Sequence, residues 1–352
     1  MTQRRLGSFG LILAKLLLAS IPIAFLLGAF ELVCRRVLFQ PVVPASDQAF
    51  FKIMSTWHPR SVYDFNASRK PVILGLSDSY GVVGSDTGSN FYDVVGDVLA
   101  RQHLDYSMVN VSVVAYETKE ELNMLERYGS RYKPAIVLQG FTVANDTFGN
   151  RQQNELHMFR FIPLEVVPLE WTSPRTWVFP AFITRYYEIV KDRYRMSRER
   201  NDDQPKSFSR EAYLQVLKSY LSHYEPGYAS STQWRDVADT LRRTIAVARR
   251  MGSRYVLVIN PDQLQVERHY QVELEREMRL DSSRYDYDLP QKLLMAFAKQ
   301  EGIPCIDLLP GFRSAGSEGG LFLLNDSHWS RQGNRLAGEL IADSLISQGI
   351  VR

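Results

Sequence analysis

The sequence contains little of several features that often reveal the class of a protein. Its 352 residues include only two cysteines, Cys34 and Cys305, which excludes a disulfide framework and a cysteine-rich metal site. The net charge is only +3 and the arginines are scattered along the chain, so nucleic-acid binding is not indicated. The sequence also has no internal repeats and no low-complexity tract, which excludes a repeat array. What remains, with 45% hydrophobic and 23% charged residues, is the composition of an ordinary folded protein.

One long hydrophobic run stands at the N-terminus. Residues 9–34 read FGLILAKLLLASIPIAFLLGAFELVC, which is long enough for a hydrocarbon core that needs about 20 residues. Arginine pairs precede and follow the run, at 4–5 and 35–36, so the charges do not give its orientation. We expect an uncleaved transmembrane anchor, with a cleaved signal peptide or a buried helix as the alternatives.

This run divides the chain into three parts. We expect a cytoplasmic stub and anchor over residues 1–36, a connector over 37–70 and a folded domain over 71–352, with an insertion at about 148–230. In the domain, short runs rich in Val and Ile alternate with helical patterns, which is typical of parallel strands buried on both faces. The strands are expected at 71–76, 107–114, 134–141, 254–261 and 303–309, and the helices at 90–102, 118–132, 234–252, 289–302 and 330–349.

The alternation predicts an α/β fold, a doubly wound, flavodoxin-like three-layer sandwich around a five-stranded parallel sheet. At the start of the second expected helix, Thr118 with Glu121 matches a capping box. In open sheets of this kind ligands bind beyond the carboxyl ends of the strands. The residues that follow each strand are therefore the candidates for a functional site.

Reactive polar residues occupy these positions. They are Ser77, Asp78 and Ser79 after the first strand, Tyr116 next to Ala115 after the second, Asn145 and Asp146 after the third, and Asp326 and His328 before the last helix. Nucleophilic acyl transfer needs a hydroxyl with a neighbouring base, a carboxylate that orients the base, and fixed N–H donors for the developing oxyanion. The set predicts that chemistry, with Ser77 or Ser79 as the hydroxyl.

The same residues resemble the conserved blocks of the SGNH (GDSL-type) hydrolase superfamily, in the same order from residue 71 to the end. "SDSYG" matches the first block, "NVSVVAYET" the second, "VAND" the third and "DSHWSRQGNRLAGEL" the last. The resemblance implies that Ser79 is the nucleophile and that Asp326 and His328 complete a triad. It assigns the oxyanion hole to the N–H groups of Ser79 and Ala115 and the amide of Asn145. Asp78 and Asp146 would support the site.

Two positions depart from these blocks. Ser77 and Ala115 stand where the first and second blocks have glycine. Alanine keeps the backbone N–H that the oxyanion hole needs, and serine is compatible with an extended backbone unless a positive φ is required.

The resemblance implies an enzyme that forms an acyl-serine and passes the acyl group to water or to a sugar hydroxyl. It is most similar to membrane-anchored members, so the substrate would be an ester or an acylated envelope polysaccharide, and the domain would lie on the periplasmic side. No cofactor or metal is implied. Two alternatives stay open: a metal-dependent phosphatase or nuclease with Asp78, Asp146, Asp326 and His328 as ligands, and a catalytically silent, tethered binding or assembly component.

Overall fold

The computed structural model describes the chain in segments that form two compact units. The described residues are 18, 20–41, 54–55, 57–61, 70–84, 87–114, 116–147, 154–155, 157–159, 167–168, 177–180, 183–184, 186–187, 190–191, 194, 207–316 and 319–352. One unit consists of Met1–Val43 with Asn154–Lys191, and the other of Pro44–Gln153 with Asp192–Arg352. The expected insertion, 148–230, is thus divided between the two units.

The larger unit is built on a five-stranded parallel sheet. Its strands are β2 (Val72–Leu76), β3 (Ser107–Asn110), β4 (Ile136–Thr142), β8 (Arg254–Asn260) and β9 (Cys305–Asp307). Their order is β3-β2-β4-β8-β9 and every neighbouring pair is parallel. Numbered along the chain this is 2-1-3-4-5, the flavodoxin-like order. The predicted α/β fold with its five-stranded parallel sheet is confirmed.

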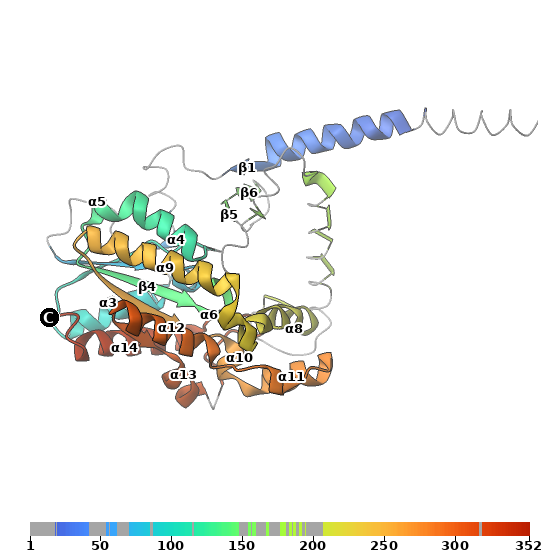
Figure 1. Cartoon of the computed structure of the whole chain (residues 1–352). Coiled ribbons are helices and arrows are strands. Elements are labelled where there is room, and N and C mark those ends of the chain that lie inside the picture. Colours follow the sequence, from blue (N-terminus) through green and yellow to red (C-terminus); the bar gives the residue numbers. More distant parts are fainter. Residues whose placement is uncertain are drawn as a thin grey trace, which may run out of the picture. The chain divides into compact units, whose positions relative to one another are not determined.

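Helices cover both faces of this sheet (Figure 1). α3 (Phe91–Arg101) and α14 (Arg331–Ser347) lie on one face, and α4 (Thr118–Met124) and α9 (Thr232–Arg250) lie on the other. The remaining helical elements of the unit are η2 (Ser79–Gly81), η3 (Leu125–Gly129), α5 (Ser130–Tyr132), α6 (Val143–Asp146), α8 (Arg210–Ser219), η5 (Tyr220–Tyr224), η6 (Pro226–Ser230), α10 (Gln263–Val266), α11 (Arg268–Met278), η7 (Ser282–Arg284), α12 (Leu289–Glu301) and α13 (Leu309–Ala315).

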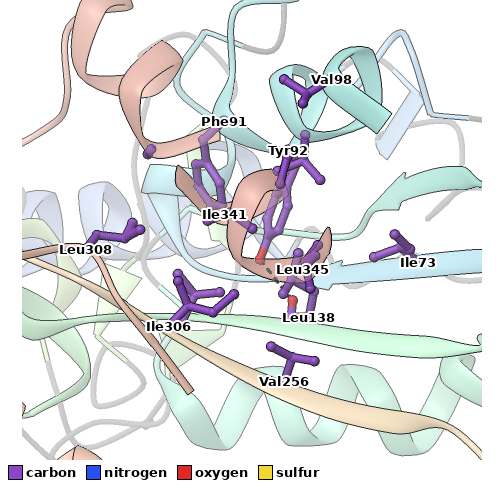
Figure 2. Close-up of a cluster of buried hydrophobic side chains, with 14 of the residues drawn as sticks. Ile73, Phe91, Tyr92, Val98, Leu138, Val256, Ile306, Leu308, Ile341 and Leu345 are labelled. Atoms are coloured by element: carbon purple, nitrogen blue, oxygen red, sulfur yellow. Dashed lines mark hydrogen bonds between the residues drawn. The ribbon is translucent and has the colours of Figure 1, made fainter. Parts of the chain in front are cut away.

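The core under α3 and α14 explains why the first strand and the last helix come together (Figure 2). Side chains that share this core are Ile73, Phe91, Tyr92, Leu138, Val256, Ile306, Ile341 and Leu345, all of them 4% exposed or less. Burying each such side chain contributes about 1.5–3 kcal/mol. The buried Tyr92 hydroxyl donates to the carbonyl oxygens of Leu76 at 2.6 Å and Leu138 at 3.0 Å, which holds α3 against β2 and β4.

Two local predictions are wrong. Helix α4 takes Glu117, not Thr118, as its N-cap, and the Glu120 carboxylate accepts the backbone N–H of Glu117 at 3.2 Å. Glu121 does not serve a capping box because it points into the interior, where Gln139 of β4 donates to it at 2.5 Å. The second strand ends at 110 rather than 114. There the side chain of Asn110 turns away to donate to the Gly81 carbonyl at 2.7 Å.

The smaller unit contains residues 20–33 as a helix, η1 (Cys34–Leu38), and two short antiparallel pairs. β1 (Phe39–Pro41) pairs with β6 (His157–Phe159), and β5 (Asn154–Glu155) pairs with β7 (Val167–Pro168). None of the helices in the described part of the chain is long and apolar enough to cross a membrane. Residues 9–17 and 19 of the expected anchor lie outside the described residues, and the anchor stays a prediction.

Candidate active site

The turn after β2 presents Ser79 at the carboxyl edge of the sheet. Ser79 opens the 3₁₀ turn η2, and the Asp78 side chain caps this turn by accepting the N–H of Tyr80 at 2.9 Å. Gly81 is required by close approach, since a Cβ there would lie 2.0 Å from Ser112 Oγ. Asn90 then holds the far end of the turn, donating to the carbonyls of Tyr80 and Val83, both at 2.9 Å.

Ser79, His328 and Asp326 lie in one hydrogen-bonded line. His328 Nε2 is 2.7 Å from Ser79 Oγ, and His328 Nδ1 is 2.5 Å from Asp326 Oδ1. The same Asp326 oxygen also accepts the backbone N–H of His328 at 2.9 Å, so the loop itself fixes the carboxylate against its histidine. Its second oxygen accepts a hydrogen bond from Ser207. The structure therefore brings together three predicted residues from opposite ends of the sequence.

The aromatic residues next to Ser79 and His328 hold the two segments together. Tyr80 donates its hydroxyl to the Ser327 carbonyl, and its ring contacts Trp329 edge to face with centroids 5.0 Å apart. Trp329 is 1% exposed and packs in the core against Phe91 and Phe312. Ser79 and His328 are thus each followed by an aromatic residue, and the contact between Tyr80 and Trp329 ties the two loops together.

Asp326 and His328 shift each other's pKa in opposite directions. Burial by itself lowers the pKa of His328, but the hydrogen bond and the negative charge of Asp326 outweigh burial and raise that pKa above 6.5. Burial likewise raises the pKa of Asp326, and its bonds to His328 and Ser207 more than compensate and lower it. An imidazole with a raised pKa next to a serine hydroxyl is suited to act as a general base.

The loop after β4 places Asn145 beside Asp78, the N-cap of the turn η2. The Asn145 amide nitrogen donates to the Tyr116 carbonyl at 2.7 Å and to Asp78 Oδ2 at 3.2 Å. Asn145 therefore connects the loops that follow β2, β3 and β4. Ala115, the remaining residue assigned to the oxyanion hole, lies outside the described residues.

The two supporting aspartates are buried under the site. Asp78 is 1% exposed and also accepts the Thr142 hydroxyl at 3.1 Å, while Asp146 accepts the Thr142 N–H at 2.7 Å. Burial raises the pKa of Asp78 and raises that of Asp146 well above its usual range, where the charges of Glu121 and Asp78 add to the effect. Both carboxyl groups are thus used to fix backbone and side chains rather than to contact solvent.

Ser77, the alternative nucleophile, is buried below the site. It is 1% exposed and donates to the Gly140 carbonyl at 3.0 Å, away from the imidazole. Ser77 is not among the non-glycine residues with positive φ, which explains why serine is tolerated where the first block has glycine.

Several residues of the site were missed by the sequence analysis. Asn90 carried a local signal, because an asparagine before a helical pattern is a favoured N-cap. Ser207, His58 and Asn110 carried none. They act through partners far away in the sequence, such as Asp326 for Ser207 and the Ser112 carbonyl for His58, at 2.9 Å.

Metal ligation is not favoured by the geometry of the predicted ligand set. Within the described ranges, no three His, Cys, Asp or Glu side chains gather as a metal site would require. The carboxylate oxygens of Asp78 and Asp326 are directed at Tyr80 N–H, Asn145, His328 and Ser207 instead. Cys34 and Cys305 are free thiols.

Comparison with known families supports this assignment of class. Residues 220–350 match the family described as "SGNH hydrolase-like domain, acetyltransferase AlgX". This part of the chain thus resembles an SGNH hydrolase-like domain, as the sequence motifs predicted, and the resemblance to a membrane-anchored branch stays a prediction. The matched range includes Asp326 and His328, but it begins at residue 220 and therefore does not include Ser79 or Asn145. No curated protein matches the sequence.

Solved structures with a similar fold include TesA, with a TM-score of 0.44 and 14% identity over 78% of this chain and 98% of that one. The acetyl xylan esterase AlAXEase gives a TM-score of 0.43 at 11% identity, covering 79% and 98% of the two chains. Esterase EstA from Pseudoalteromonas sp. gives 0.41 at 12% identity, covering 79% and 97%. At these TM-scores and identities, the similarities establish neither the activity nor the substrate of this chain.

Proposed function

We propose that the chain is a serine-dependent acyl-ester hydrolase or O-acyltransferase that works through an acyl-serine intermediate. The observation that carries the proposal is the pair of short contacts of His328, 2.7 Å to Ser79 Oγ and 2.5 Å to Asp326 Oδ1. This is the geometry of an activated nucleophile, in which the base is held by a third group.

The first half-reaction uses the imidazole as base and then as acid. His328 Nε2 takes the Ser79 proton as Oγ attacks the ester carbonyl carbon, and the carbonyl electrons move to oxygen. The imidazolium is stabilised by Asp326. When the tetrahedral intermediate collapses, the C–O bond to the alcohol breaks, and His328 returns the proton to the leaving alkoxide, so that acyl-Ser79 remains.

The oxyanion would be held by the N–H groups of Ser79 and Ala115 and by the amide of Asn145. The longer of the two Asn145 contacts, 3.2 Å to Asp78, is the one that an oxyanion would replace, while the 2.7 Å bond to the Tyr116 carbonyl keeps the amide in place. Removal of one such donor lowers the rate by about 10²–10³-fold. We therefore expect Asn145→Ala to lower kcat by about this factor.

The second half-reaction decides between hydrolysis and transfer. Water or a sugar hydroxyl attacks the carbonyl carbon of acyl-Ser79 and loses its proton to His328. The bond between that carbon and Ser79 Oγ then breaks, and His328 returns the proton to Oγ, which releases the acid or the acylated sugar. We propose acylated envelope polysaccharide or another small ester as the substrate. The support is the family match to an acetyltransferase domain, together with the expected membrane anchor.

A serine-directed phosphonate provides the decisive test. We expect it to label the full chain at Ser79 and to fail with Ser79→Ala, while Ser77→Ala, the matched control, leaves Ser79 as the labelled residue. An absence of labelling in the wild type would refute the acyl-serine mechanism and favour a silent component. Assays with p-nitrophenyl acetate, with and without a polysaccharide acceptor, then separate hydrolysis from transfer.

A further inference from the structure

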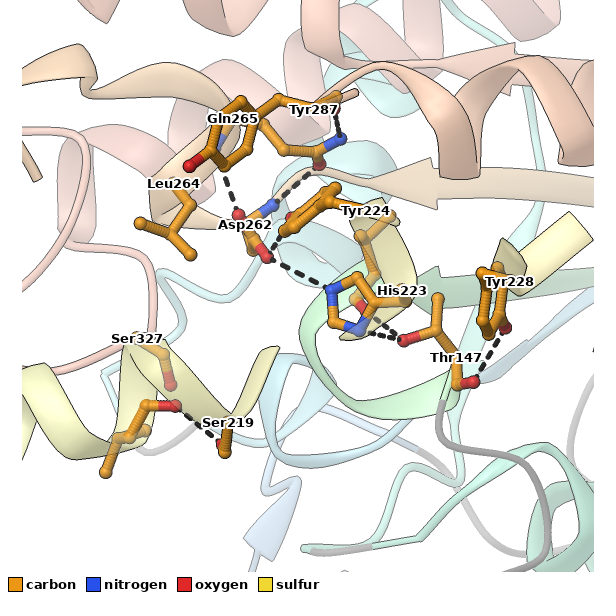
Figure 3. Close-up of polar contacts among 12 residues, drawn as sticks. Thr147, Ser219, His223, Tyr224, Tyr228, Asp262, Leu264, Gln265, Tyr287 and Ser327 are labelled. Atoms are coloured by element: carbon orange, nitrogen blue, oxygen red, sulfur yellow. Dashed lines mark hydrogen bonds and ion pairs between the residues drawn. The ribbon is translucent and has the colours of Figure 1, made fainter. Parts of the chain in front are cut away.

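A second histidine, His223, lies buried next to Thr147 (Figure 3). His223 of η5 is 1% exposed, and its ring lies between Thr147 and Asp262. The His223 Nδ1 atom is 2.9 Å from Thr147 Oγ1, and Nε2 is 3.9 Å from Asp262 Oδ2. Burial lowers the pKa of His223, against the opposing effect of Asp262, which favours the neutral ring. The mechanism above uses none of these groups.

The Thr147 hydroxyl contacts both α6 and the ring. The Thr147 hydroxyl has a single proton and donates it to the Val143 carbonyl at 2.7 Å. The same Thr147 oxygen is 2.9 Å from His223 Nδ1, so this one hydroxyl group joins the imidazole to the backbone of α6. Exchanging Thr147 for a residue without a hydroxyl therefore removes both bonds at once.

Thr147 ends the short helix that carries Asn145. Helix α6 has only four residues, too few to be stable by its own hydrogen bonds. At its start the Asp146 carboxylate accepts the Thr142 N–H at 2.7 Å. At its end the Thr147 side chain bonds to Val143 and to His223, and the Thr147 carbonyl accepts the Tyr228 hydroxyl at 2.6 Å.

The other side of the ring faces a group fixed to the sheet. Asp262 follows strand β8 and is fully buried. One of its oxygens accepts the Gln265 N–H at 3.0 Å, and the other accepts the Tyr224 hydroxyl. The position of Asp262 is therefore set by β8 and α10. The planar His223 ring lies between Asp262 and Thr147 and so keeps the end of α6 at a fixed distance from Asp262.

We propose that His223 and Thr147 are positioning residues that hold the Asn145 amide where the oxyanion forms. This inference rests on the proposed function, because an oxyanion forms next to Asn145 only if Ser79 attacks an ester carbonyl. The alternative is that the buried pair stabilises the fold without any specific effect on Asn145. The two roles differ in one measurable respect, which is whether the effect of Thr147 depends on Asn145.

The test measures kcat and KM of the full chain with p-nitrophenyl acetate. Thr147→Val keeps the shape and removes the hydroxyl. We expect about tenfold lower kcat with KM within about twofold, since small displacements of a catalytic group cost about this much or more. Thr147→Ser restores the oxygen and should recover kcat to within about threefold. The matched control is Thr244→Val in α9, a fully buried threonine that also donates to the carbonyl four residues earlier, at 3.0 Å.

A double-mutant cycle separates positioning from general stability. In an Asn145→Ala background, Thr147→Val should lower kcat no further, because the group that it positions is already absent. The same loss in both backgrounds, or a wild-type kcat for Thr147→Val, would overturn the proposal. If Thr147→Val fails to fold, His223→Asn and His223→Gln take its place in the cycle. Asparagine keeps a polar amide near the Nδ1 position and should retain more activity than glutamine.

The cycle also distinguishes the inference from the proposed function. Wild type and Ser79→Ala are compared first, and a Ser79-dependent activity establishes the acyl-serine chemistry independently of His223. Without that activity the proposed function fails, and the positioning role fails with it. With that activity, an additive cycle refutes the positioning role alone.

Discussion

At the residue scale, His328 lies between the Ser79 hydroxyl, which it would deprotonate in the proposed mechanism, and the Asp326 carboxylate, which raises the pKa of the imidazole. Ser79 and Asp326 contact opposite nitrogens of the ring, so the tautomer that hydrogen-bonds to Asp326 leaves Nε2 free of a proton and directed at Ser79. Ser207 adds a hydrogen bond to the outer oxygen of Asp326. The ring orientation is therefore determined by short contacts on both sides.

The raised pKa of His328 predicts the pH dependence of the reaction. The base must be neutral, so kcat/KM should rise with pH and level off above an apparent pKa higher than 6.5. Asp326→Asn removes the largest effect that raises the pKa of His328, whereas the burial of the imidazole, which lowers this pKa, remains. The inflection of the pH–rate profile should therefore move to lower pH. The maximal rate should fall by about 10³–10⁴, because the asparagine stabilises the wrong tautomer. Measured pH–rate profiles of both proteins check this, and an unchanged inflection would contradict it.

At the scale of elements, the turn η2 lies close to the segment that follows β3, and this close approach sets the geometry of Ser79. Gly81 packs directly on Ser112, and Asn110 donates to the Gly81 carbonyl at 2.7 Å. The two segments touch backbone to side chain, with no space for a methyl group between them. The site consequently depends on an element that contributes no reactive side chain.

Gly81→Ala should disrupt this contact. The added Cβ would lie 2.0 Å from Ser112 Oγ, so we expect a loss of about 3 kcal/mol in the free energy of unfolding and loss of Ser79 labelling. Gly227→Ala is the control, because its Cβ would meet nothing within 4 Å. Adding Ser112→Gly to the first variant should restore part of the stability, and failure to do so would show that the strain lies elsewhere. Urea unfolding measures the free energy of unfolding of the wild type and of the three variants.

A second element-scale prediction concerns the segment before β2. His58 is 2% exposed and hydrogen-bonds to the Ser112 carbonyl at 2.9 Å, and burial lowers its pKa to about 4. Below pH 6.5 the unfolded chain binds the proton more readily than the folded one. Stability should therefore decline as pH falls from 6.5 to about 4, by about 3 kcal/mol in total from this group.

His58→Gln keeps a donor for Ser112 and removes the titration. Its free energy of unfolding should change less between pH 6.5 and 4 than that of the wild type, as measured by urea unfolding at several pH values. His103→Gln is the control, because the His103 side chain is exposed to solvent in the folded state as well. Parallel pH curves for His58→Gln and wild type would contradict the assignment.

At the scale of the whole molecule, the expected anchor gives a prediction that concerns the N-terminal run alone. Residues 9–34 are apolar over a length that fits a bilayer, so we expect the full chain to remain with membranes after alkaline carbonate extraction. Deleting residues 1–36 should release it. If expression of the complete sequence yields a protein that lacks its N-terminal residues and is extracted by carbonate, the run is a cleaved signal peptide instead. Fractionation with N-terminal sequencing distinguishes the two.

The sequence predicted all five strands of the sheet, because each is a short apolar run between polar turns. Boundaries were less accurate where a long-range contact ends an element, as at Asn110, whose side chain binds Gly81. The helices of the 207–230 segment and the additional helices α10, α11 and α13 were not predicted. Their amphipathic patterns are short, and only packing against the rest of the unit stabilises them.

The amino-acid sequence by itself determined the order of strands and helices and the identity of the reactive side chains, because hydrophobic periodicity and local motifs are properties of neighbouring residues. The resemblance to known sequence blocks implied Ser79 as the nucleophile, but only the tertiary structure shows which hydroxyl contacts the imidazole. Ser77 and Ser79 are two residues apart, yet one is buried against Gly140 and the other contacts His328, 249 positions away. The partners of His58, Ser207 and His223 were likewise decided by folding, since a buried polar group is satisfied by whichever group the packed chain brings to it.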